Sequence, residues 1–361
     1  MIKLLFHMFM EMHVMNNSVR LKLLLTLFLF LFWFGEGFSQ RYPEPVIDSL
    51  ICNGIKDIIN QDYKDAKSTF EYLDLHYPEL PAGKIFIAAT DIARTFDYSE
   101  YIANDSTFDK LSEAQKQAQK LVEKNPGSVW YHYFLALAEG YTAYYNGLNG
   151  NWFPALKRGL SSISDFKDCL KINPIFFEAY TAIGTYKYWR SRKTEFLNWL
   201  PFVKNEEDSG IVDLKLSIEH STYHRYLAMN SLLWIYIDKK NFSEAKSLAE
   251  RALSDYPNVR LFMWGLARAY EGIDPQKSID FYFEILKSYQ SISGLNRCRE
   301  ITLKHIIAQL YYRIGKKEKA LVECDEILNI NNLSEFEKKS LDDRLYRVKQ
   351  LKKDLLKDLS K

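Results

Sequence analysis

Apolar residues recur along the chain at the three- and four-residue spacing of amphipathic helices, and no alternating stretch is long enough to require a strand. The helical segments pair across short polar breaks, which predicts helical hairpins. We place seven hairpins at 46–60/63–77, 81–98/107–125, 128–147/152–172, 175–197/208–222, 225–238/242–256, 259–272/274–291 and 294–314/316–330. Residues 333–358 form a further predicted helix, whose charged positions suit a cap on an open stack.

The hairpins share a sequence pattern that indicates internal repetition. Prolines close four helical segments, at Pro78, Pro126, Pro174 and Pro257. Ten residues after each proline comes a small residue, and these are Ala88, Ala136, Gly184 and Ala267. Small residues at one fixed offset predict that two helices approach closely at that point of each repeat.

The clearest repeat unit spans residues 226–259. It has Leu232, Leu233, Tyr236, Ala245, Ala249, Ala252 and Pro257 at the spacing of the tetratricopeptide repeat, and it resembles that family. The unit at 46–78 and the units that follow 226–259 up to residue 330 are similar. The middle units are about 48 residues long and depart from the pattern. The resemblance implies an all-α superhelical solenoid over 40–330 with a C-terminal capping helix over 331–361. It also implies that the solenoid binds protein partners.

The pattern of residues at the amino terminus predicts an export signal. The segment Leu23–Phe34 is apolar except for Thr26, follows Arg20, and rises only about 18 Å as a helix, too short for a bilayer core of roughly 30 Å. We predict a signal peptide over 1–39, cleaved near Ser39, and hence an exported bacterial protein of the periplasm or medium with no transmembrane span in the mature chain. An uncleaved anchor and a translation start at Met15 remain alternatives.

Composition narrows the class of protein further. Hydrophobic residues make up 47% of the chain, which suits a folded protein, and the 15 glycines and 10 prolines are too few for a turn-rich β-sandwich. The net charge of +2 argues against nucleic-acid binding, which needs a basic surface. The four cysteines have no metal-binding spacing, so we expect buried apolar side chains.

No motif in the chain predicts catalysis or a cofactor. The sequence contains neither a phosphate-binding loop nor a nucleophile elbow. His220 and His224 have the i, i+4 spacing of zinc ligands, and Glu219 adds a carboxylate. The metalloprotease pattern, however, requires Glu directly after the first His, where this chain has Ser221. We therefore predict a non-enzymatic protein with no catalytic residue and no metal site.

The resemblance also predicts where a partner would bind. In this family the first helix of each hairpin lines the concave face. Three positions on that helix form one stripe: the third residue before the small residue, the first residue after it and the fourth residue after it. The stripe consists of Thr181, Thr185, Tyr188, Asn230, Trp234, Ile237, Trp264, Arg268, Glu271, His305, Gln309 and Tyr312. Aromatic and hydrogen-bonding side chains on one stripe are typical of protein-binding surfaces. The alternative is an exposed helix face with incidental aromatics.

A second candidate surface is the connection that contains Phe196, Trp199 and Phe202. It could pack as a plug on the neighbouring repeat or serve as an exposed aromatic docking segment. The hypothesis that we favour is an exported scaffold that binds a peptide or protein along its concave groove. The alternative is a carbohydrate- or lipid-binding accessory protein of the bacterial envelope. The identity of the partner and the oligomeric state stay open.

Overall fold

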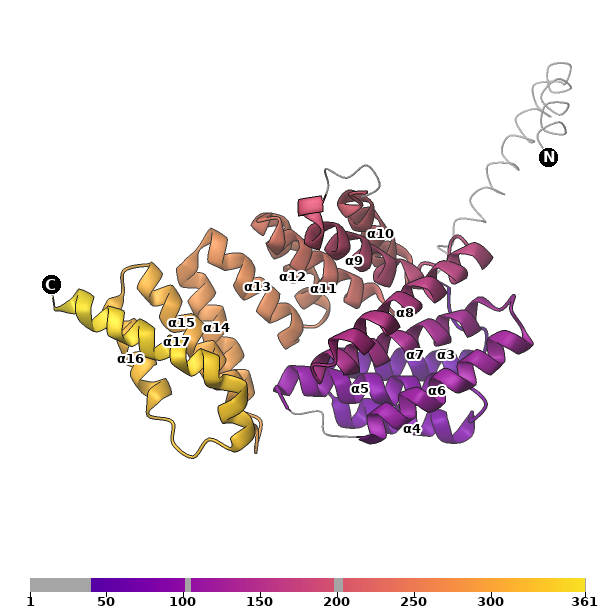
Figure 1. Ribbon diagram of the computed structural model, residues 1–361, viewed down its shortest axis with the longest axis horizontal. Helices are drawn as coiled ribbons and strands as arrows, with labels where there is room; N and C mark the ends of the chain where they lie inside the picture. Colours follow the sequence, from indigo (N-terminus) through magenta and orange to yellow (C-terminus); the bar gives the residue numbers. More distant parts are fainter. Residues whose placement is uncertain (1–39, 101–104, 198–203, 361) are drawn as a thin grey trace, which may run out of the picture. The chain divides into compact units, whose positions relative to one another are not determined.

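The computed structural model describes residues 40–100, 105–197 and 204–360, and these residues form only helices (Figure 1). The helices are α3 (Pro45–Asn60), α4 (Tyr63–His76), α5 (Ala82–Tyr98), α6 (Asp105–Lys124), α7 (Val129–Leu148), α8 (Trp152–Ile172), α9 (Glu178–Lys193), η1 (Glu195–Leu197), α10 (Glu207–His220), α11 (Arg225–Asp238), α12 (Phe242–Asp255), α13 (Arg260–Ile273), α14 (Pro275–Gln290), α15 (Cys298–Arg313), α16 (Lys317–Leu328) and α17 (Glu335–Leu359). The all-α prediction is confirmed. Residues from Gln40 onward form one compact unit, whereas the predicted signal peptide lies outside the described residues.

The hairpins follow the predicted order, and two helices begin three or four residues later than predicted for local reasons. Helix α9 begins three residues later than predicted, because the backbone after Asn173 first turns through a hydrogen bond from Phe176 N to Asn173 O (3.0 Å). Helix α15 begins at Cys298 instead of 294. Gly294 adopts φ +75°, and the Asn296 side chain accepts a hydrogen bond from the Cys298 N–H (2.9 Å), so the helix starts after this turn.

Packing between the hairpins follows the repeat logic of a stacked solenoid. Consecutive helices pack against each other, and alternate helices also touch in pairs such as α5 with α7, α9 with α11 and α15 with α17. The odd-numbered helices therefore form one layer, and the apolar faces that a lone hairpin would expose are buried between neighbours.

The close helix approach predicted at the small residues is clearest between α9 and α10. A Cβ atom on Gly184 would lie 2.7 Å from the backbone oxygen of Gly210, and a Cβ atom on Gly210 would lie 2.6 Å from that of Gly184. Two glycines thus let these backbones touch. The corresponding alanines in the other hairpins are fully buried, namely Ala88, Ala136 and Ala267.

Aromatic side chains join the first half of the stack into one core. Trp130 on α7 contacts the rings of Tyr42, Tyr133, Phe176 and Tyr223, with centroid separations between 5.1 and 6.0 Å. Such edge-to-face contacts hold the α3 end of the chain against the α10–α11 connection.

The four cysteines are free thiols. Cys169, Cys298 and Cys324 are buried, as predicted, whereas Cys52 is half-buried. Burial raises the pKa of the Cys298 and Cys324 thiols to about 11, so these groups stay protonated and pack as small apolar side chains at neutral pH.

Candidate functional site

The predicted stripe lies on the odd-numbered helices α9, α11, α13 and α15, but three of its members are buried. The Thr181 hydroxyl pairs with the Ser217 hydroxyl (2.6 Å), and the Tyr188 hydroxyl donates to Asp238 Oδ2 (2.6 Å). His305 is buried as well, with 2% exposure. These three side chains hold hairpins together and present little surface to a partner.

The surface-facing part of the stripe centres on α11. Trp234 is half-buried, and its indole Nε1 donates to Asn230 Oδ1 (3.2 Å). Thr185 on the neighbouring α9 is half-buried too, and its hydroxyl oxygen has no hydrogen-bond partner among the described residues. The Thr185 hydroxyl oxygen is itself buried from solvent, so the groups that this region offers to a peptide are the indole face of Trp234 and the Asn230 amide.

The α13 part of the stripe is a connected polar and aromatic cluster. Arg268 is about half exposed and pairs with Glu271 Oε2 (2.6 Å), while Glu271 Oε1 accepts a hydrogen bond from the Tyr282 hydroxyl (2.7 Å). Trp264 Nε1 donates to the Tyr289 hydroxyl (3.3 Å). Arg268 is therefore the member of this cluster that most faces solvent.

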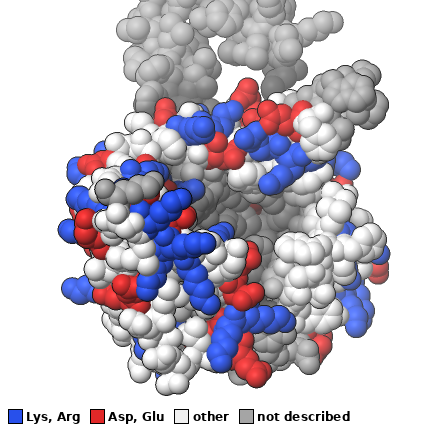
Figure 2. Space-filling model, turned by 60° about the vertical axis from the view of Figure 1, so that its left-hand side comes forward, with Lys and Arg blue, Asp and Glu red and all other residues white. Residues whose placement is uncertain are grey.

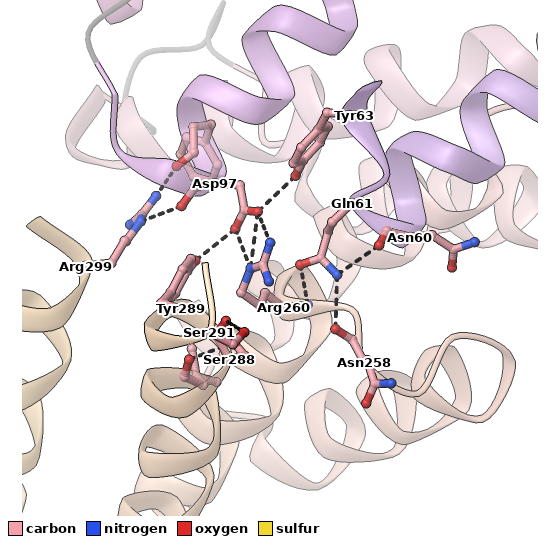
Figure 3. Close-up of polar contacts among 12 residues, drawn as sticks. Asn60, Gln61, Tyr63, Asp97, Asn258, Arg260, Ser288, Tyr289, Ser291 and Arg299 are labelled. Carbon is pink, nitrogen blue, oxygen red and sulfur yellow. Dashed lines mark hydrogen bonds and ion pairs between the residues drawn. The ribbon is translucent and has the colours of Figure 1, made fainter. Parts of the chain in front are cut away.

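The side of this cluster near Trp264 is occupied by the end of α5, through an interaction that the sequence analysis missed (Figure 3). The Asp97 carboxylate accepts hydrogen bonds from Arg260 Nε (3.0 Å), the Tyr63 hydroxyl (3.1 Å) and the Tyr289 hydroxyl (2.9 Å). Arg299 Nε donates to the Asp97 carbonyl oxygen (2.8 Å). We call these five residues the Asp97 cluster.

Burial gives the Asp97 cluster its strength. The side chains of Arg260 and Asp97 are only 9% and 11% exposed. Burial alone would lower the pKa of Arg260, but its hydrogen bond with Asp97 and the Asp97 charge outweigh this effect and raise that pKa. Burial, together with the Asp97 charge, also raises the pKa of Tyr63 and Tyr289, so both phenols remain hydrogen-bond donors.

A second contact, made by Gln61, also joins the first hairpins to the later helices. The Gln61 amide donates to the Asn258 carbonyl oxygen (3.0 Å), and its Oε1 accepts from Arg260 N (3.2 Å). The first hairpins thus bond directly to helices that start some 160 to 200 residues later. Repeats in an open solenoid contact only their neighbours, so this chain departs from that rule.

The other end of the stripe is covered by α17. Arg344 lies 3.3 Å from His305 Nδ1, and the Tyr312 hydroxyl donates to Asp358 (3.1 Å). Gln309, between His305 and Tyr312 on α15, remains exposed. The uncovered part of the stripe therefore lies mainly between Thr185 on α9 and Arg268 on α13.

The packing of α17 on His305 predicts an acid-sensitive contact. Burial, and to a smaller extent the charges of Arg344 and Arg347, lower the pKa of His305 to about 4. The unfolded chain, with an ordinary pKa near 6.5, binds the proton first, so this stabilisation is present above pH 6.5 and is lost as the pH falls toward 4. When the pH is lowered from 7 to 5, the free energy of unfolding of the wild type should decrease. In the His305→Gln variant we expect this decrease to be smaller by roughly 1 to 2 kcal/mol, as measured by urea denaturation.

An exposed histidine provides the control for that measurement. The variant is His76→Gln on α4, since His76 is exposed and lies outside the α15–α17 contact, so a difference specific to His305→Gln reports that contact. Parallel pH profiles for the wild type and His305→Gln would contradict the assignment.

Glu178 and His224 form a polar cluster that is sealed inside the fold. The Glu178 carboxylate accepts from the backbone N–H groups of Thr222 (2.5 Å), Tyr223 (3.1 Å) and His224 (3.0 Å) in the turn ahead of α11. Burial raises the pKa of Glu178 to about 7, although these hydrogen bonds oppose it, and lowers the pKa of His224 to about 4. Both side chains are buried and bonded within the fold, which indicates a structural role.

His220 and His224 do not converge as metal ligands. His220 is exposed at the end of α10, where its ring lies 4.6 Å from that of Phe177, whereas His224 is buried beyond the turn and contacts the Tyr133 hydroxyl (3.2 Å). Within the described ranges no three His, Cys, Asp or Glu side chains are grouped to hold a metal ion.

The second predicted surface is described only in part. Phe196 in η1 is 74% exposed, whereas Trp199 and Phe202 lie outside the described residues.

The charged surface of the protein mixes both signs. On the face drawn in Figure 2, Lys and Arg side chains are interspersed with Asp and Glu around a hollow. Neither sign dominates there, in keeping with the net charge of +2.

Solved tetratricopeptide repeat proteins are similar to this chain. One, from Thermus thermophilus, is 16% identical with a TM-score of 0.38 and covers 62% of this chain and 98% of its own. Another, from Parabacteroides merdae, is 14% identical with a TM-score of 0.36, covering 82% of this chain and 97% of its own. The C-terminal part of a third, from Cytophaga hutchinsonii, is 15% identical with a TM-score of 0.39, covering 81% and 99%. No family model matches the sequence, and no curated protein matches it.

Proposed function

We propose that this protein is an exported, non-enzymatic scaffold that binds a peptide segment of a partner protein on its odd-numbered helices. The observation that carries the proposal is the uncovered surface between Thr185 and Arg268, with Trp234 at its centre. The Asp97 cluster occupies the Trp264 side of the α13 part of the stripe, and α17 covers the α15 part, so the surface between Thr185 and Arg268 is the part that they leave to a ligand. Export is supported by the short apolar segment Leu23–Phe34 and its basic flank.

The chemistry of this surface favours an apolar side chain next to a polar group on the partner. The Trp234 indole supplies a flat apolar face, and Asn230, whose Oδ1 holds the indole, still has amide hydrogens to donate. Arg268 is 51% exposed and pairs with Glu271, whose side chain is only 12% exposed. The solvent-facing N–H groups of the Arg268 guanidinium can donate to a carbonyl or carboxylate of the ligand. A peptide with one aromatic or aliphatic anchor matches these features.

The anchor role of Trp234 gives a direct test. Peptides selected from a displayed random library against the wild-type chain should lose at least about tenfold in affinity for the Trp234→Ala variant, since buried aromatic anchors each contribute roughly 2 kcal/mol. Isothermal titration calorimetry measures this loss. The control is Tyr346→Ala on α17, which removes an aromatic ring that is 63% exposed and lies off the stripe. Equal affinities for all three proteins would show that the peptides bind elsewhere.

A further inference from the structure

The α7–α8 hairpin carries an apolar surface that the scaffold function does not use. With 20 and 21 residues, its helices make up the longest hairpin in the described part of the chain. Trp152 and Phe153, at the start of α8, are 74% and 79% exposed, and Leu156 one turn later is 62% exposed. We call the exposed residues Tyr144, Leu148, Trp152, Phe153, Leu156 and Leu160 the aromatic tip.

The members of the aromatic tip share one end of the hairpin. Trp152, Leu156 and Leu160 follow at four-residue intervals along α8, so they lie on one face of that helix. Tyr144 and Leu148 have the same interval on α7, directly before the turn. Leu148 and Trp152 are four residues apart across the turn, so the exposed apolar residues of the two helices meet at this end of the hairpin.

The fold does not bury this surface. The buried residues of α8 are Ser162, Phe166 and Cys169, all in its second half, and nothing from Trp152 to Ser161 is buried. Large aromatic side chains left in water at a helix start are unfavourable unless they meet an apolar surface elsewhere.

The charged residues near the aromatic tip indicate which kind of partner can bind it. The sequence has no Asp or Glu between Glu139 and Asp165, and its charged residues in that interval are Lys157 and Arg158. Arg158 is paired with the buried Glu139 (2.9 Å), whereas Lys157 is exposed. The acids nearest to the tip outside this interval are on the start of α6, where Phe108 contacts Tyr145 (5.6 Å) and Asp109 is exposed. The turn itself, with Trp, Phe, Leu and a lysine and no acid of its own, complements anionic headgroups over an acyl layer.

We infer that the aromatic tip inserts into the interfacial layer of an anionic lipid bilayer. Trp and Phe partition into this layer because their rings are large and apolar, and a turn between two helices can enter it by the required depth of about 5 to 10 Å. The tip lies on a different hairpin from Trp234, so lipid binding would leave the peptide surface on α11 accessible. This inference goes beyond the proposed function and does not depend on it.

A fluorescent probe at the turn reports this insertion directly. The variant Asn151→Cys in the full chain, labelled with an environment-sensitive dye, keeps every member of the aromatic tip. Labelling at neutral pH is selective, because burial raises the pKa of the remaining half-buried thiol, Cys52, to about 11. With vesicles of phosphatidylethanolamine and phosphatidylglycerol we expect blue-shifted emission and quenching by brominated acyl chains.

Two matched proteins make the experiment decisive. The same dye at Asn331→Cys, in the exposed α16–α17 turn, should show no quenching. Adding Trp152→Ala and Phe153→Ala to the labelled Asn151→Cys protein should raise the lipid concentration for half-maximal signal at least tenfold, because about 60 Å² of lost apolar contact over the two rings together suffices for that factor. Its urea midpoint should stay that of the parent, since both rings are exposed.

Three outcomes would overturn the inference. The first is an absence of any response at position 151, and the second is equal quenching at positions 151 and 331, which indicates unspecific adsorption. The third is an emission change that follows protein concentration without vesicles, which would assign the aromatic tip to a second copy of the chain. None of these outcomes affects peptide binding at Trp234, which is measured separately.

Discussion

Replacing Asp97 by Ala should lower the free energy of unfolding by about 3 to 5 kcal/mol, the range for removing one partner of a buried ion pair. The substitution leaves the Arg260 guanidinium, 9% exposed, without its counter-charge. It also removes the acceptor of the Tyr63 and Tyr289 hydroxyls. The loss is large because the remaining groups cannot reach water without opening the contact between the first hairpins and α13–α15.

Urea denaturation followed by circular dichroism measures this loss. The control is Glu250→Ala, which breaks the exposed i, i+4 pair with Lys246 (3.7 Å) on α12 and should cost no more than about 0.5 kcal/mol. Asp97→Asn keeps an acceptor without the charge and should fall between the two. A loss below about 1 kcal/mol for Asp97→Ala would mean that the ion pair is not buried in solution.

The Asp97 cluster also bears on how the repeats unfold. Stability in an open solenoid is the sum of local terms, so its ends fray first. A bond between the first hairpins and α13–α15 couples distant repeats instead, and the wild type should unfold as one unit. The same denaturation curve of Asp97→Ala should then broaden or split, because the ends lose their connection.

Gly184→Ala should destabilise the protein by about 2 to 3 kcal/mol, although alanine is the better helix former. The new Cβ atom would lie 2.7 Å from Gly210 O and 2.9 Å from the Asp213 Cβ, and the backbone of α10 cannot yield as a side chain could. The α9–α10 crossing must therefore widen. The thermal midpoint, measured by calorimetry, should fall accordingly.

Gly147→Ala on α7 is the matched control with the opposite sign. Apart from the adjacent backbone of α7, no atom of the described residues lies within 4 Å of a Cβ built at Gly147, so only the helix propensity changes, and stability should rise by up to about 1 kcal/mol. If both substitutions were neutral or stabilising, the backbone contact between Gly184 and Gly210 would be absent in solution.

The hairpins were predictable because their signals are local. The segments 225–238 and 242–256 match α11 and α12 to within one residue, since apolar periodicity and the Lys239–Asn241 turn mark both ends. Predictions failed where a turn replaced helix. Residues before Glu178 and Cys298 carry helix-like apolar patterns, but Gly294 and the turn closed by the Asn296 side chain stop α15 from starting earlier.

The candidate site was predictable only as a set of positions. The stripe lies on the odd-numbered helices as the repeat offset required, yet the same offset could not distinguish the half-buried Trp234 from the buried Tyr188 and His305. Burial at those two positions depends on Asp238 and on α17, which come from other elements. The aromatic tip was overlooked because a turn with Gly150 and Asn151 shows no periodicity that reveals exposure.

The order of helices, their hairpin pairing and the small residues at their crossings follow from the amino-acid sequence, because each depends on neighbours a few residues to a few tens of residues apart. The bond between Asp97 and Arg260, the cover that α17 places on His305 and the open surface around Trp234 were decided by the tertiary structure alone. Each of these depends on the small rotation between successive hairpins added over the stack. A few degrees more or less per hairpin would separate Asp97 from Arg260, and no local sequence pattern encodes that sum.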